Sequence, residues 1–127
     1  MEWVAIVTSL ALLQVFVFAL QVGQARVKYG VNAPIITGPN EFDRAFRVHQ
    51  NTVEQLIIFV PGLWIFAYFV RPDVAAGLGV LFIVGRQIYR NTYVADPAKR
   101  SAGFGIGALA TVILLLGGLI GAIIAAI

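Results

Sequence analysis

Long apolar stretches alternate with short polar segments along the whole chain. The first apolar stretch covers about residues 3–24 and ends in a basic segment, and the second runs from about 41 to 70. The third begins at about 74 and becomes polar before it ends near 93, and the fourth covers about 100–127. Because roughly 20 apolar residues cross a bilayer as a helix, this pattern predicts four transmembrane helices joined by short loops.

The composition supports a membrane protein and argues against a soluble domain. Of 127 residues, 60% are hydrophobic and only 12% are charged, about half the charged share of an ordinary soluble protein. We therefore predict an all-α fold, a single integral membrane domain over 1–127 that forms an up-down bundle. Gly103 and Gly107 have the small-xxx-small spacing of closely packed helices, although a generally glycine-rich span gives the same pattern.

The charges predict an orientation and exclude some partners. Arg26 and Lys28 flank the first loop and Lys99 and Arg100 the third, whereas the second has only Arg71 beside an aspartate. The positive-inside rule places the first and third loops in the cytoplasm.

A net charge of +3 argues against a nucleic-acid partner, and the absence of cysteine excludes disulfides and thiolate metal sites, so no metal is expected. The membrane is a bacterial inner membrane or an endoplasmic reticulum, and the short loops favour a bacterium.

Two polar half-helices are expected to meet at the cytoplasmic side, one from each of two antiparallel helices. At about 100° per residue, four polar side chains of the second helix fall within an arc of about 80°: Arg44, Arg47, Asn51 and Glu54. On the third helix a comparable arc of about 60° contains Arg86, Tyr89 and Tyr93, with Arg90 beside it. The alternative is an interfacial collar, in which arginines reach the headgroups, tyrosines form an aromatic belt and Glu54 pairs with an arginine.

The residue types of these two ladders favour a small zwitterionic ligand with more than one carboxylate. Arginine binds carboxylates through two parallel hydrogen bonds, and the Glu54 carboxylate is suited to an ammonium group. Ionisable groups at membrane depth persist when they pair, line a wet cavity or bind a ligand. Apolar flanks would admit a second, lipophilic substrate from the bilayer.

At these residues the sequence resembles the MAPEG superfamily, which includes microsomal glutathione transferases and leukotriene C synthase. The matching segments are "TGPNEFDRAFRVHQNTVEQL", "GRQIYRNTYVADPAKR" and "LQVGQARVKYG". The resemblance implies a homotrimer with a glutathione site between neighbouring subunits and glutathione as cosubstrate. It implies that Arg100 is the catalytic residue beside the thiol, that Arg86 supports the pocket and that Arg26 helps from the end of the first helix. By the same resemblance, glutathione is held by Arg47, Asn51, Glu54, Tyr89 and Tyr93.

Some positions depart from the family pattern. Gln55 stands where members often have a tyrosine, and His49 replaces a glutamine near the ligand. Val27 replaces a second arginine of leukotriene C synthase, and the sequence therefore does not support the epoxide activity of that enzyme. Four residues are predicted to lie at the rim of the site: Arg44, His49, Gln55 and Arg90.

The predicted function is a membrane-bound glutathione transferase that conjugates glutathione to lipophilic electrophiles in detoxification, with reduction of lipid hydroperoxides as a second activity. A first alternative is a non-catalytic lipid-binding or scaffold member of the same family. A second is a small multidrug exporter, but this class requires a membrane carboxylate that the first span lacks.

Overall fold

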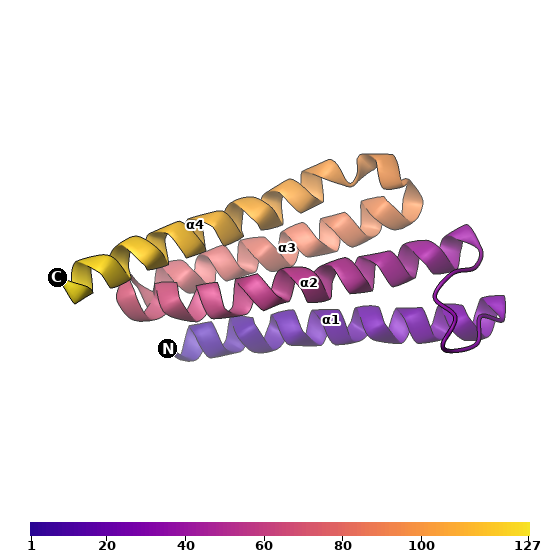
Figure 1. Ribbon diagram of the computed structural model, residues 1–127, viewed down its shortest axis with the longest axis horizontal. Helices are drawn as coiled ribbons and strands as arrows, with labels where there is room; N and C mark the ends of the chain where they lie inside the picture. The colour runs from indigo at the N-terminus through magenta and orange to yellow at the C-terminus, as the bar shows by residue number, and fades with distance from the viewer.

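Four long helices and one short helical turn make up the chain, and the computed structural model describes residues 1–127. The helices are α1 (Glu2–Tyr29), α2 (Asn40–Phe69), α3 (Pro72–Ala95) and α4 (Ser101–Ala126), and the 3₁₀ turn η1 (Pro97–Lys99) precedes α4. They run up and down side by side, so both termini lie at one end of the bundle and loop 30–39 and η1 at the other (Figure 1). The predicted all-α, up-down topology is confirmed.

α1 and α3 are longer than the apolar stretches that predicted them. α1 continues through the basic segment to Tyr29, where Gly30 adopts a left-handed conformation (φ 68°) and its N–H bonds to the carbonyl of Arg26. Such a glycine ends a helix because it lacks the Cβ that would clash at positive φ. Polar residues at the loop end therefore extend the helices, and helical geometry fixes where their side chains point.

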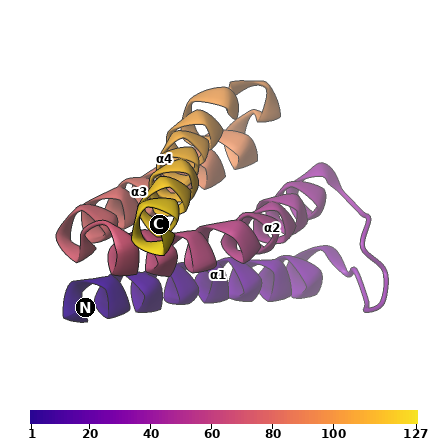
Figure 2. The ribbon, with the colours of Figure 1, turned by 60° about the vertical axis from the view of Figure 1, so that its left-hand side comes forward.

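The α2–α3 pair forms the centre of the bundle, and α1 and α4 pack against it from opposite sides (Figures 1 and 2). The rings of Phe59 on α2 and Phe82 on α3 stack at a centroid distance of 3.8 Å, and they belong to a buried apolar cluster that also contains Leu63, Val4 and Leu114. This central pair separates two faces, one covered by α1 and one covered by α4.

Close approach of α3 and α4 depends on glycine. A Cβ placed on Gly103 would lie 2.3 Å from the backbone N of Tyr89, and one on Gly85 would lie 2.8 Å from the backbone N of Gly107. The small-residue spacing of α4 thus marks a true helix contact. This contact brings the start of α4, with Arg100, next to Tyr89.

Three helical segments are long and apolar enough to cross a membrane: α1, α2 and residues 97–126. α3, which carries Arg86 and Arg90 in its second half, is less apolar, and its membrane crossing stays a prediction. Most large apolar side chains point outward, for example Trp3, Phe16 and Ile124, as expected of helices that face lipid.

Candidate functional site

The two predicted polar ladders meet at the end of the bundle that carries loop 30–39. They surround a cavity of about 440 Å³ on the face that α4 covers, and its lining includes six of the predicted site residues. These six are Arg47, Asn51, Glu54, Tyr89, Tyr93 and Arg100, and Gln50 is the seventh lining residue. The side chains come from α2, α3 and the residue before α4, and they gather here because antiparallel helices bring the start of α2 to the end of α3. Their roles in binding and catalysis stay predictions.

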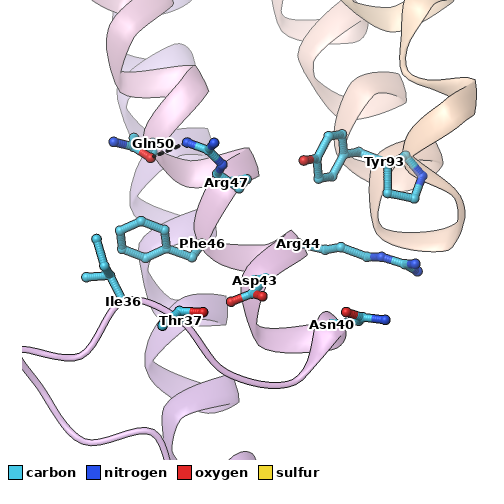
Figure 3. Close-up of a pocket in the computed structure, with 10 residues that line it drawn as sticks. Ile36, Thr37, Asn40, Asp43, Arg44, Phe46, Arg47, Gln50 and Tyr93 are labelled. Atoms are coloured by element: carbon cyan, nitrogen blue, oxygen red, sulfur yellow. Dashed lines mark hydrogen bonds between the residues drawn. The ribbon is translucent and has the colours of Figure 1, made fainter.

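The cavity is the middle part of a longer trough. On one side, an outer hollow of about 590 Å³ shares Arg47, Gln50 and Tyr93 with it and reaches Ile36 and Thr37 of the first loop. Figure 3 shows this hollow, with Tyr93 projecting from α3 towards α2 and Arg47 donating to Gln50 Oε1 at 3.2 Å. The outer hollow therefore extends the trough to the first loop at the end of the bundle.

On the other side, a hollow of about 370 Å³ shares Asn51, Tyr89 and Arg100 with the cavity and continues to Ser101 and Phe104. Phe104 is 39% exposed, so an apolar wall lies one helical turn from the Arg100 backbone. The charged Arg100 and the apolar Phe104 are therefore adjacent at the start of α4.

Three charged side chains of the cavity have no partner of opposite charge. The protein contains two ion pairs, Met1 with Glu2 and Arg71 with Asp73, and both lie at the opposite end of the bundle. Arg47, Glu54 and Arg100 are exposed and form no ion pair with each other or with any other residue. The sequence left open whether an arginine pairs with Glu54, and within this protomer none does.

Arg86 supports the cavity from below. It is 1% exposed and donates from Nη2 to Asn51 Oδ1 at 2.8 Å and to Thr52 Oγ1 at 2.9 Å. Its guanidinium also lies 4.2 Å from the centroid of the Tyr89 ring, a cation–π contact. Because the Asn51 oxygen accepts from Arg86, its NH₂ group is free to donate into the cavity. Arg86 therefore fixes both Asn51 and Tyr89 without lining the cavity itself.

The remaining predicted residues lie elsewhere. Arg44, expected at the rim, lines the outer hollow but donates to the carbonyls of Val94 and Ala95 at 3.1 and 3.4 Å, so it caps the end of α3. Arg26 donates to Ile35 O at 2.6 Å and lies over the Phe42 ring at 5.1 Å, which ties it to the first loop of its own protomer.

The other three rim candidates are not on this trough. Arg90 projects to the α1 side, where its Nε donates to Gln21 Oε1 at 3.1 Å, and His49 and Gln55 are partly buried outside the three hollows. Sequence reasoning missed Gln50, although its place one turn after Arg47 and one turn before Glu54 was a usable signal. It also missed Ser101 and Phe104, for which the sequence offered no comparable signal.

The arrangement suits a compact polar ligand of mixed charge. Two unpaired guanidinium groups and the Asn51 NH₂ can hold carboxylates or another anion, and the Glu54 carboxylate can accept from an ammonium. The hydroxyls of Tyr89 and Tyr93, whose rings stack at 5.4 Å, can donate as well as accept. Arg100 lies where this polar set meets the apolar wall at Phe104.

Comparison with known proteins shows the family of this chain. The chain is 44% identical over 118 residues to an uncharacterized protein of Synechocystis, an alignment that covers 93% of this chain and 86% of that protein. It is 43% identical over 117 residues to human microsomal glutathione S-transferase 2, covering 89% and 80%. It is 34% identical over 102 residues to bovine leukotriene C4 synthase, covering 78% and 68%. The sequence model of the MAPEG family matches residues 4–120, and the chain therefore belongs to the MAPEG family.

Proposed function

We propose that this protein is a membrane-bound glutathione transferase that conjugates glutathione to lipophilic electrophiles. The observation that carries the proposal is the set of unpaired charges in one cavity, Arg47, Arg100 and Glu54. Glutathione presents two carboxylates, one ammonium and one thiol, so its charges complement this set. Similarity to human microsomal glutathione S-transferase 2 over 89% of the chain supports the same reading.

Each charged group has a proposed partner on the ligand. Glu54 accepts from the ammonium of glutathione, while Arg47 and the Asn51 NH₂ bind its carboxylates. The tyrosine hydroxyls at 89 and 93 supply further hydrogen bonds along the peptide. Arg86 acts through Asn51 and Tyr89, because it holds them from the buried side.

Arg100 is the proposed catalytic residue and faces the thiol. A free thiol has a pKa of about 8.5, so only a few per cent is thiolate at neutral pH. A fixed guanidinium stabilises the thiolate, and the thiol proton leaves to water through the open trough. The thiolate then attacks an electrophilic carbon, an S–C bond forms and the leaving group departs with its electron pair.

A second activity follows from the same thiolate. Attack on the terminal oxygen of a lipid hydroperoxide breaks the O–O bond, and the lipid alkoxide takes up a proton to become an alcohol. The resulting sulfenic acid of glutathione reacts with a second glutathione to give the disulfide and water. Phe104 and the lipid-facing surface beside it would hold the apolar part of either acceptor substrate.

The proposed active form is a homotrimer with a site between neighbouring subunits. Two observations support it: Arg47, Glu54 and Arg100 are exposed at the surface of the protomer, and Arg26 lies outside the trough of its own chain. A neighbouring subunit would cover these charges and present its own Arg26 to them. Mass measurement of the purified complex tests the assembly.

The test of function compares two neighbouring cations. Conjugation of glutathione to chlorodinitrobenzene is measured for the wild type, for Arg100→Ala and for Lys99→Ala, which removes the same charge from an exposed residue outside the trough. We expect Arg100→Ala to lose at least 100-fold in kcat, as removal of a group that stabilises developing charge does, and Lys99→Ala to retain activity. Equal activity of the two variants would overturn the role of Arg100.

Glutathione binding separates catalysis from a non-catalytic role. A ligand at 100 times its Kd stabilises a protein by about 2.7 kcal/mol, so glutathione should raise the unfolding temperature of the wild type. Protection by glutathione without conjugation of any electrophile would favour the scaffold alternative. An absence of protection would contradict the proposed site.

A further inference from the structure

A second polar cavity lies on the opposite face of the α2–α3 pair, under α1. Its volume is about 280 Å³, and its lining includes three charged residues, Lys28 on α1, Glu41 on α2 and Arg90 on α3, together with the amides of Gln21 and Gln24. None of these residues lines the trough on the α4 side. The central helices separate the two cavities, so a ligand here is distinct from the proposed glutathione.

The three charges of this cavity do not neutralise each other. Lys28, Glu41 and Arg90 belong to neither of the two ion pairs in the protein. Two cations and one carboxylate from three different helices thus face one space without pairing. A ligand with a negative group and a positive group would satisfy all three.

Arg90 is held in place and retains free donors. Its Nε donates to Gln21 Oε1 at 3.1 Å and its Nη1 to Asn91 Oδ1 at 3.4 Å. A guanidinium has five N–H donors, so three are left for a ligand. Gln21 is on α1, and its bond to Arg90 orients the guanidinium at the boundary between the two helices.

Further polar contacts join α1 to α3 deeper in the bundle, beyond the residues that line the cavity. Gln14 Nε2 donates to Ile83 O at 2.9 Å and to Gln87 Oε1 at 3.4 Å, one or two turns further into the bundle. Towards the other end, the cavity reaches Lys28 in the last turn of α1 and Glu41 in the first turn of α2. It therefore opens at the end of the bundle where α1 ends and α2 begins, which is where headgroups are expected if these apolar helices cross the bilayer.

We propose that this cavity binds the headgroup of a phospholipid that carries a phosphate and a primary ammonium, as phosphatidylethanolamine does. Arg90 and Lys28 bind the phosphate, since guanidinium and ammonium groups are the usual protein donors to phosphate. Glu41 accepts from the lipid ammonium. A quaternary ammonium has no N–H to donate to Glu41, and a headgroup without a positive charge leaves Glu41 facing a like charge.

The experiment measures lipid binding to the full-length protein purified in detergent. Native mass spectrometry follows titrations with phosphatidylethanolamine, phosphatidylcholine and phosphatidylglycerol of equal chain length. We expect the ethanolamine lipid to bind about tenfold more tightly than either other lipid, a ratio typical of one charge-assisted hydrogen bond. Equal binding of all three lipids, or tighter binding of phosphatidylglycerol, would overturn the proposal.

Variants assign the two halves of the headgroup. Lys28→Gln and Arg90→Gln should each weaken binding of phosphatidylethanolamine by about tenfold, while Lys99→Gln, which removes an exposed cation at the same end of the bundle, should not. Glu41→Gln should abolish the preference for ethanolamine over choline. Lys28 and Glu41 are exposed, so their variants should fold even if Arg90→Gln loosens α1 from α3, and unchanged binding in both would refute the assignment.

Discussion

A single methyl group added at Gly103 should disturb both the packing of α4 and the proposed catalytic residue. A Cβ at this position would lie 2.3 Å from the backbone N of Tyr89, and another at Gly105 would have nothing within 4 Å. Because backbone atoms cannot swing aside as a side chain does, Gly103→Ala requires α3 and α4 to separate by about 1 Å to reach ordinary contact.

The matched variant Gly105→Ala isolates that contact. Both substitutions gain up to about 1 kcal/mol from the better helix propensity of alanine, whereas overpacking at Gly103 costs about 1–3 kcal/mol. Gly103→Ala should therefore be less stable than Gly105→Ala by about 1–3 kcal/mol. Thermal unfolding of both variants in detergent, followed by circular dichroism, measures the difference.

Activity gives the second readout. Arg100 precedes α4 and Tyr89 faces it from α3, so a shift of α4 moves the two groups apart. Misplacement by about 1 Å commonly costs about 100-fold in rate, and we expect a loss of this order in kcat for Gly103→Ala in the conjugation assay. If Gly103→Ala matches Gly105→Ala in both stability and kcat, the helix contact does not position the site as argued.

Three further substitutions test single features of the site. Arg86→Met removes the hydrogen bonds to Asn51 and Thr52 and should raise the Kd for glutathione at least tenfold, as measured by calorimetry. The free energy of unfolding should change less, because the variant no longer has to bury a charged group. Glu54→Gln should weaken the binding of glutathione by about 1.5–3 kcal/mol, the usual contribution of a charged hydrogen bond. The binding of an analogue without the amino group should not change. Arg44→Ala should lower the free energy of unfolding by about 1–3 kcal/mol through loss of the α3 cap, with glutathione affinity largely kept. Equal losses for glutathione and its deaminated analogue, or an unfolding curve of Arg44→Ala that matches the wild type, would contradict the respective assignment.

The sequence by itself determined the four helices and most of the side chains that line the main cavity. Apolar stretches of membrane length predict helices, and the 100° rotation per residue gathers Arg47, Asn51 and Glu54 on one side of α2. The up-down order then brings Tyr89 and Tyr93 to the same end. These features follow from local periodicity and short connections, which any reader of the chain can count.

Only the tertiary structure decided which neighbour each side chain meets. Arg44 belongs to the same ladder as Arg47 but binds the carbonyls that end α3, and Arg90 follows Tyr89 directly but faces α1 and a different cavity. Periodicity gives the rotation of a side chain about its own helix axis, whereas its partner depends on where the next helix lies. The position of the next helix is set by contacts such as that of Gly103 with the backbone of Tyr89, and these contacts join residues far apart in the chain.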